Sequence, residues 1–350
     1  MTVYTMMQGE ESNMNNERKI LLLATGGTIA STLFEHGLAP GIGAQQLISY
    51  LPEADRDAYS IDTVQVCNID STNMTPEYWI KIVQTIEENY LSYDGFVICH
   101  GTDTMAYTSA ALSYMIQNSN KPIVITGSQK PISEDSTDAR QNLLDSIRYA
   151  ADPASQGVVL VFNGNVIAGT RAKKTYAHSY NAFSSVNFPA LAAIQDKRII
   201  RFIPQQPYTQ PVRFIKKLHE SIVVMKLIPG TKPDLMEYLF RNYDCIVIES
   251  FGVGGIPQSL MEVFYQQMKE WASKGKIVVI ATQVVNEGSN MEVYEVGQKV
   301  KQDFHLMEAY DMTIEAVITK LMVLMAECGG DYTAINDGFY KTINYDLVSR

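Results

Sequence analysis

Runs of apolar residues alternate with segments of helical periodicity along the first half of the chain. A short continuous apolar run indicates a strand buried on both faces, and an apolar position every three or four residues indicates a helix with one buried face. We predict strands at Lys19–Ala24, Ile61–Asn68, Gly95–Cys99, Pro122–Thr126 and Val158–Phe162, and helices at Pro76–Asn89, Thr104–Gln117 and Asp138–Ala151. This βαβ order predicts an α/β fold with a doubly wound, mostly parallel sheet.

The stretch Arg201–Pro211, which is rich in proline and glutamine, interrupts this order, and a second, shorter series follows it. There we predict strands at Ser221–Leu227, Cys245–Glu249 and Lys276–Ala281, and helices at Leu235–Arg241, Ser259–Ser273 and Thr313–Ala326. A chain of 350 residues is long for a single hydrophobic core. We therefore expect a flexible leader (1–17), a larger N-terminal domain (18–203), a linker (204–220) and a smaller C-terminal α/β domain (221–350).

Charge, cysteines and histidines narrow the possible functions. The net charge of −10 argues against a nucleic-acid partner, which would require a basic face. The four cysteines show no CxxC spacing, and three of them lie in or beside apolar runs, which is typical of small buried side chains in a reducing compartment. The five histidines show no HExxH or HxH pairing, so we expect no metal site. Because we find neither a signal-peptide pattern nor an apolar stretch of about 20 residues, we expect a cytoplasmic protein without a membrane partner.

Two short motifs follow predicted strands and carry candidate chemistry. The first is Thr25-Gly26-Gly27-Thr28-Ile29-Ala30, in which two glycines allow a sharp turn and a close approach to a ligand. A structural alternative is a simple turn in which Thr28 caps the next segment, because the motif lacks the lysine of a phosphate-binding loop. The following residues, 29–43, contain several glycines and little periodicity, so we expect a lid over the site.

The second motif is His100-Gly101-Thr102-Asp103-Thr104-Met105, at the start of a predicted helix. Thr102 and Asp103 are good helix caps, which is the structural alternative to a catalytic role. Both motifs lie at the carboxyl ends of predicted parallel strands, however, and that edge of an α/β sheet is where ligands bind. The two threonines are therefore candidates for one shared site.

A lysine and a serine complete the candidate set. Lys174 ends the basic segment Gly169–Lys174, which we place in a loop; such clusters are usually solvated, but a desolvated lysine held by a carboxylate acts as a base toward a hydroxyl. Ser71 lies between a strand and a helix, where a polar turn is the ordinary interpretation. It is also placed to direct hydroxyl and N–H donors at a substrate carboxylate.

Taken together, these segments resemble the asparaginase family, and in particular the cytoplasmic type I L-asparaginases. The resemblance spans nearly the whole chain in the family's order, through Ala24–Ala30, Ser71–Trp79, Tyr93–Leu112, Pro122–Gln129, Gly169–Asn187, Ser250–Gln258 and Asp311–Leu321. It implies a large Rossmann-like N-terminal catalytic domain, a small C-terminal domain and a homodimer or homotetramer. It also implies hydrolysis of L-asparagine to L-aspartate and ammonia without a cofactor.

The resemblance places roles on single residues. Thr28 matches the attacking hydroxyl, and Thr102, Lys174 and Asp103 match the Thr-Lys-Asp group. Lys174 rather than Lys173 matches, because nine residues separate it from Phe183 of the Phe-x-Ser-x-Asn stretch.

Other residues match substrate contacts. Ser71 and, with less support, Thr72 match positions that hold the α-carboxylate, and Asp103 matches the residue that binds the α-amino group. Backbone N–H groups at the glycine turn, which includes Gly27, and near Thr102 are plausible oxyanion donors.

Three positions depart from the family pattern. Leu38 stands where bacterial members usually carry a tyrosine in the lid, so the base that activates Thr28 is an open question. Tyr294 is the candidate that the resemblance offers, with packing in the C-terminal domain as its alternative role. Glu249 and Val284 stand where the allosteric members carry an arginine and a cysteine, so we expect no activation by asparagine.

Two other functions remain open. The amidase subunit of the archaeal glutamyl-tRNA(Gln) amidotransferase shares these motifs but normally has an added domain before the first one, whereas 24 residues precede Thr25 here. A non-catalytic amino-acid-binding protein on the same scaffold is the other alternative. The presence of all four residues Thr28, Thr102, Asp103 and Lys174 argues against it.

Overall fold

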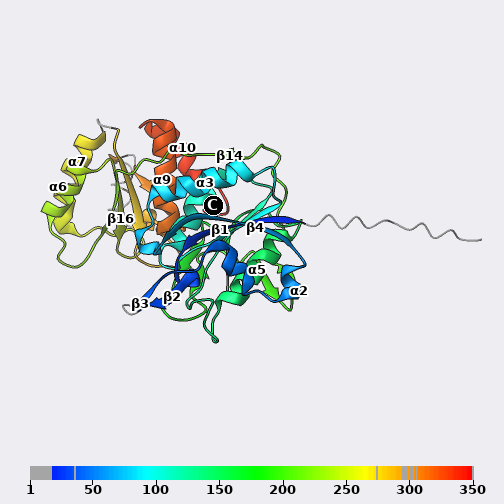
Figure 1. Ribbon diagram of the computed structural model, residues 1–350. Helices are drawn as coiled ribbons and strands as arrows, with labels where there is room; N and C mark the ends of the chain where they lie inside the picture. The colour runs from blue at the N-terminus through cyan, green and yellow to red at the C-terminus, as the bar shows by residue number, and fades with distance from the viewer. Residues whose placement is uncertain are drawn as a thin grey trace, which may run out of the picture.

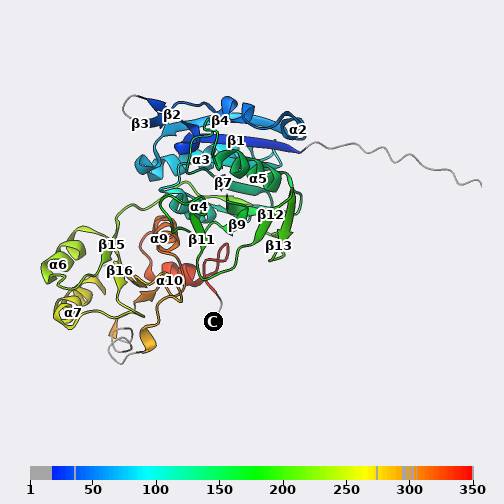
Figure 2. The same cartoon turned by 90° about the horizontal axis from the view of Figure 1, so that it is seen from below.

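The computed structural model describes residues 18–34, 37–272, 275–293, 298, 301, 303–304 and 306–348. It shows a larger and a smaller α/β domain lying side by side (Figures 1 and 2). The predicted fold class is confirmed.

The larger domain is built on an eight-stranded sheet in the order β13-β12-β9-β8-β7-β5-β1-β4. Strands β4, β1, β5, β7 and β8 run parallel, and β9, β12 and β13 extend the sheet with antiparallel pairings that the sequence analysis did not predict. The strands are β1 (Lys19–Gly26), β4 (Ser60–Ile69), β5 (Gly95–Cys99), β7 (Pro122–Thr126), β8 (Gly157–Phe162), β9 (Asn165–Ala168), β12 (Ala192–Gln195) and β13 (Arg198–Arg201).

Both faces of this sheet are covered, as the continuous apolar runs predict. Side chains alternate between faces along a strand, so Leu21 and Leu23 of β1 pack on one side while Ile20 and Leu22 pack on the other. The first side faces helices α3 (Pro76–Asn89) and α4 (Met105–Met115). The second side faces α1 (Ala44–Ser49) and α5 (Ala139–Ala151), and the short helix α2 (Glu53–Arg56) lies between α1 and β4 in the chain.

The smaller domain has a parallel four-stranded sheet of β15 (Ile222–Lys226), β16 (Cys245–Ser250), β17 (Ile277–Thr282) and β18 (Met307–Glu308). Helices α6 (Pro233–Asn242) and α7 (Gln258–Ala272) cover one face, and the short turn η3 (Met291–Val293) follows β17. Helices α9 (Ile314–Cys328) and α10 (Tyr332–Tyr340) cover the other face. Residues of α4 and α9 belong to one apolar cluster, so α9 joins the two domains, as Figure 2 shows.

Two predictions of local structure are wrong. The segment after Thr28 is not an irregular loop: a 3₁₀ turn η1 (Thr28–Ala30) leads into an antiparallel hairpin of β2 (Ser31–Phe34) and β3 (Gly37–Pro40), whose backbone hydrogen bonds the sequence pattern did not reveal. Helix α4 also ends at Met115 rather than Gln117. Its last predicted residues form β6 (Ile116–Gln117), which pairs with β14 (Arg213–Phe214) of the expected linker.

The four cysteine thiols are free, with Cys99 and Cys245 buried and Cys67 and Cys328 half-buried. Among the described helices, none combines the length and the apolar character that crossing a membrane requires. In the part of the chain that the structure describes, no group of three or more His, Cys, Asp or Glu side chains is arranged to hold a metal ion.

Candidate active site

The glycine turn after β1 brings the loop that carries Thr28 against the loop that carries Thr102. Gly26 and Gly27 have positive φ angles of 101° and 78°, which residues with a Cβ atom rarely adopt. A Cβ atom at Gly27 would also collide with the backbone N and Cα of Gly101. The two loops therefore touch backbone to backbone, and each candidate threonine directly follows one of the glycines in contact.

The backbone of Gly27 is fully engaged in holding this turn. Its N–H donates to the carbonyl of Ile69 at 3.0 Å, and its carbonyl accepts from the backbone N–H of Ala30 at 3.1 Å and from the Ser31 hydroxyl at 2.9 Å. The expected role of Gly27 as an N–H donor to the substrate therefore does not fit this geometry. Thr28, which begins η1 and is half-buried, is the next residue able to present its backbone to a ligand.

His100 fixes the peptide that precedes Thr102. The indole N–H of Trp79 donates to the Thr108 hydroxyl at 2.9 Å, and this hydroxyl also lies 2.9 Å from Nε2 of His100. A carbonyl oxygen only accepts, so the imidazole proton lies on Nδ1 and is donated to the Gly101 carbonyl at 2.7 Å, and Nε2 of the neutral ring accepts the hydroxyl hydrogen of Thr108. Burial lowers the pKa of the His100 imidazole to about 4, so the ring is neutral near neutral pH.

Neither Thr102 nor Asp103 caps helix α4, so the structural alternative for this motif is wrong. The N-cap position is Thr104, and its hydroxyl donates instead to the Ser71 carbonyl at 2.7 Å. Thr102 is buried, and its hydroxyl contacts two side chains, Lys174 and Gln129.

Lys174 joins the two candidate residues of the second motif. Its Nζ lies 2.9 Å from Thr102 Oγ1 and 2.7 Å from Asp103 Oδ1. The expectation of a loop is wrong: Lys174 ends strand β10 (Ala172–Lys174), which pairs with β11 (Phe183–Ser185) so that Lys174 lies opposite Phe183. The solvated alternative is wrong as well, because the Lys174 side chain is only 19% exposed.

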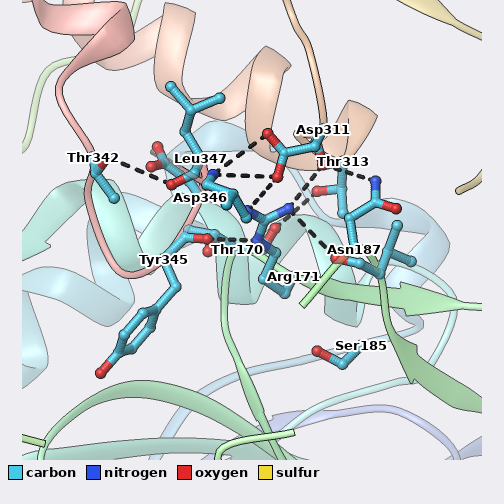
Figure 3. A network of polar contacts seen from close by, with 12 residues as sticks. Thr170, Arg171, Ser185, Asn187, Asp311, Thr313, Thr342, Tyr345, Asp346 and Leu347 are labelled. Carbon is cyan, nitrogen blue, oxygen red and sulfur yellow. Dashed lines mark hydrogen bonds and ion pairs between the residues drawn. The ribbon is translucent and has the colours of Figure 1, made fainter. Parts of the chain in front are cut away.

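The other side of β10 is held by the C-terminal domain. Side chains alternate along a strand, so Arg171 and Lys173 point away from Lys174. Lys173 pairs with Glu315 at the start of α9 at 3.0 Å. The fully buried Arg171 pairs with Asp311 at 2.8 Å and donates to the Tyr345 carbonyl, as Figure 3 shows.

Residues 342–348 form a strap that closes over this network. The Thr170 hydroxyl donates to the Asn344 carbonyl at 2.6 Å, and the Val348 N–H donates to the Asp311 carboxylate. The Thr313 hydroxyl donates to the Thr170 carbonyl at 2.9 Å (Figure 3). The position of Lys174 thus depends on the larger domain, the smaller domain and the C-terminal strap together.

Ser71 and Thr72 lie in the 3₁₀ turn η2 (Ser71–Asn73) that follows β4. Ser71 is buried, and its hydroxyl lies against Gly101, because a Cβ atom there would be 2.6 Å from Ser71 Oγ. Thr72 is exposed, and both its N–H and its hydroxyl already donate to Asp70 Oδ1, at 2.8 and 2.7 Å. The geometry favours Ser71 over Thr72 as a donor to a substrate.

Two further residues at this sheet edge were not singled out from the sequence. Gln129 contacts Thr102 Oγ1 through its Oε1 at 3.3 Å, and His100 fixes the adjacent peptide. Gln129 comes soon after the buried strand β7, and His100 comes directly after β5. A search for polar residues at the carboxyl ends of all predicted parallel strands would have found both.

The three positions that depart from the family pattern fall in two places. Leu38 lies on β3, paired with Leu33 of β2, and Tyr294, the candidate base, lies outside the described residues. Glu249 and Val284 line one cavity of about 190 Å³ at the carboxyl ends of the smaller sheet. The two departures that we linked to effector binding therefore converge on one site.

Comparisons with known proteins identify the family of this chain. Residues 19–207 match the family profile described as Asparaginase, N-terminal, and residues 221–339 match the Glutaminase/Asparaginase C-terminal domain. An L-asparaginase from Thermococcus kodakarensis is 38% identical over 308 residues, covering 87% of this chain and 92% of the relative. A glutamyl-tRNA(Gln) amidotransferase subunit from Methanococcus vannielii is 33% identical over 328 residues, covering 89% of this chain and 75% of the relative.

The fold has a close counterpart among solved structures. The thermostable L-asparaginase from Thermococcus kodakarensis superposes with a TM-score of 0.88 at 34% identity, covering 95% of this chain and 100% of that chain. Both matches from Thermococcus kodakarensis are named L-asparaginases, so the chain falls in an amide-cleaving class of enzyme. The chain belongs to the asparaginase family of amidohydrolases.

Proposed function

We propose that this protein hydrolyses the side-chain amide of L-asparagine to L-aspartate and ammonia, with Thr28 as the nucleophile. The observation that carries the proposal is the contact of Lys174 with Thr102 and Asp103, directly beside the backbone contact between Gly27 and Gly101. Amide cleavage needs a nucleophile, a group that moves its proton, and donors for the oxyanion. Around this contact we assign the nucleophile to Thr28, proton movement at Thr102 to Lys174, and the oxyanion donors to backbone N–H groups of the two loops.

The reaction has two steps that both use Thr28. Its Oγ attacks the carboxamide carbon and loses its proton, while the amide nitrogen gains a proton and leaves as ammonia. Water then cleaves the acyl-enzyme, releases L-aspartate and returns a proton to Thr28. Because the Gly27 N–H is engaged with Ile69, we assign the oxyanion to the backbone N–H groups of Thr28 and Thr102.

Proton transfer requires a base near each hydroxyl. Lys174 in its neutral form would take a proton from Thr102, with which it is already in contact. Thr28 needs a separate partner, and we assign this role to the phenol of Tyr294. Ser71 would hold the substrate α-carboxylate, Thr72 would assist after release from Asp70, and Asp103 would bind the α-amino group with a carboxylate that is 58% exposed.

The test measures release of ammonia from L-asparagine and, in separate reactions, from L-glutamine and D-asparagine, with a chelator present. We expect turnover of L-asparagine without metal or nucleotide and much weaker action on L-glutamine, since one extra methylene moves the amide carbon by about 1 Å, enough to cost about 10²-fold. Thr28→Ala and Thr102→Ala should abolish turnover. Thr85→Ala deletes a hydroxyl on α3 that bonds only within its helix, and it should remain active. Full activity of a folded Thr28→Ala protein would refute the proposal.

The likeness to the amidotransferase subunit from Methanococcus vannielii supports a second candidate function. An enzyme of that kind would release ammonia from glutamine, and it would do so together with a partner protein. Hydrolysis of glutamine rather than asparagine in the same assay would favour this candidate. Binding of asparagine in calorimetry without any release of ammonia would indicate a non-catalytic binding protein instead.

We also propose a cytoplasmic homodimer or homotetramer with a domain boundary in the linker 204–220. The four free thiols are consistent with a reducing compartment. Light scattering of the purified protein measures the assembly state, and a monomer at micromolar concentration would contradict this part of the proposal.

A further inference from the structure

Gln129 follows strand β7, and its backbone is fixed independently of its side chain. Its N–H donates to both carboxylate oxygens of Asp138, at 3.1 and 3.0 Å. Asn142 donates to the same carboxylate at 3.1 Å and to the Gly127 carbonyl at 3.0 Å. Because this turn is anchored on helix α5, a change in the Gln129 side chain should leave the backbone path intact.

The orientation of the Gln129 amide is determined by its partners. Its Nε2 lies 3.1 Å from the carbonyl of Ala177 and 3.1 Å from the carbonyl of Ser179. Carbonyl oxygens only accept hydrogen bonds, so the NH₂ group must face them, and Oε1 must face Thr102. If the amide were turned the other way, its oxygen would face the carbonyl oxygens of Ala177 and Ser179, and three acceptors would lie together without a hydrogen to share.

This orientation determines where the Thr102 proton points. A lysine ammonium only donates, so the Thr102 oxygen accepts from Lys174 at 2.9 Å. The Gln129 oxygen only accepts, so the single hydroxyl hydrogen of Thr102 points to it, at a long distance of 3.3 Å. In this state the proton that Lys174 must later receive points away from Lys174.

We propose that Gln129 is a positioning residue: it orients the Thr102 hydroxyl and holds the loop after Lys174 at a fixed place beside it. This inference rests on the proposed function. Its amide ties residues 177–179, which follow Lys174 closely in the chain, to the hydroxyl that Lys174 contacts. The long bond to Thr102 holds the hydroxyl in one rotamer but is weak enough to release it. For Lys174 to accept this proton, the Thr102 hydrogen has to turn from Gln129 to Nζ, which rotation of the hydroxyl group achieves.

Two substitutions separate positioning from a merely structural clamp. Gln129→Met keeps the side-chain length and removes all three hydrogen bonds, so kcat should fall at least tenfold while KM changes less than threefold. Gln129→Glu directs a carboxylate at the two carbonyls. Its activity relative to the wild type should rise as the pH is lowered from 8 to 5, because a protonated carboxyl group again donates one hydrogen bond.

Gln156→Met is the matched control. Gln156 also donates through its side-chain amide to a backbone carbonyl, that of Gln206, at 2.7 Å, but it is buried and lies beside the amino end of β8 at the opposite edge of the sheet. The Gln156→Met substitution should lower the melting temperature and leave kcat within twofold of the wild type. Melting temperatures of all variants are measured beside the kinetics.

The outcomes distinguish this inference from the proposed function. A wild-type protein that releases no ammonia refutes the proposed function, whatever the variants do. An active wild type with Gln129→Met within twofold in kcat refutes the positioning role. The positioning role is also refuted if the activity of Gln129→Glu relative to the wild type is the same at pH 8 and pH 5. It is refuted as well if the variants lose activity only in proportion to their loss of melting temperature.

Discussion

The adjacent lysines of β10 provide a sharp test of the site, because the strand turns them to opposite sides. Lys174 contacts Thr102 and Asp103, whereas Lys173 pairs with Glu315 of α9 through both carboxylate oxygens, at 3.0 and 3.3 Å. Lys174→Met and Lys173→Met are the same chemical change, one residue apart. The structure predicts opposite consequences for activity and stability.

Lys174→Met should affect activity and spare stability. Its ion-pair partner Asp103 is 58% exposed, so water replaces the lost ammonium, and a pair of this kind contributes about 0–1 kcal/mol. Loss of a proton-transfer group lowers kcat by about 10²–10⁴-fold. We therefore expect kcat to fall by about 10²-fold or more at an almost unchanged unfolding midpoint.

Lys173→Met should affect stability and spare activity. It leaves the Glu315 carboxylate, which is 8% exposed, without its ammonium partner. An unpaired buried polar group costs about 1–3 kcal/mol, and the position of Glu315 in the first turn of α9 keeps the cost toward the lower end, because the helix dipole favours a negative charge there. We expect a loss of about 1–2 kcal/mol and a kcat within threefold of the wild type.

The assay is ammonia release at saturating L-asparagine together with urea unfolding, at one protomer concentration for all proteins because assembly shifts the midpoint. Lys173→Met with a kcat as low as that of Lys174→Met would show that the assignment of the catalytic lysine is wrong. Lys174→Met with more than a tenth of wild-type kcat would remove Lys174 from the mechanism.

Three further predictions concern the effector cavity, Tyr294 and acid stability. Glu249 puts a carboxylate in the 190 Å³ cavity where the resemblance to the allosteric members places an arginine, so the dependence of rate on asparagine should be hyperbolic, and a Hill coefficient well above one would contradict this. Tyr294→Phe should lower kcat at least about tenfold, since losing a proton-transfer partner costs ~10²-fold or more, and unchanged kcat with an unchanged melting temperature would leave Tyr294 a packing role. Because the folded-state pKa of His100 is about 4 against 6.5 for a free imidazole, the unfolded chain binds more protons between these values, and stability should fall by about 3 kcal/mol from pH 6.5 to pH 4 and then level off. Urea midpoints of the wild type and His100→Asn at pH 7, 5.5 and 4.5 check this, and identical pH dependence of the two proteins would contradict it.

The elements of both sheets could be predicted because they depend on local pattern. The mostly apolar runs Gly95–Cys99 and Pro122–Thr126 became strands with those bounds, and Pro76–Asn89 became a helix with its predicted start and end. The hairpin β2–β3 and strands β9, β12 and β13 were missed. Their register depends on hydrogen bonds to partner strands, which a single segment does not encode.

By itself, the sequence determined the α/β class, the alternation of strands and helices along the chain, and the sheet edge that carries Thr28, Thr102 and Ser71, because alternation and turn residues act over a few neighbouring positions. It also contains the spacing of Lys174 from Phe183, which the structure explains as the register of the β10–β11 pair. Only the tertiary structure decided that Lys174 reaches Thr102 while Lys173 and Arg171 face the smaller domain. The contact joins residues 72 positions apart, and it exists only because α9, the C-terminal strap and β11 hold β10 with one side toward the site. The same holds for Gln129, whose amide orientation follows from two carbonyls of a distant loop and from no feature of its own neighbours in the chain.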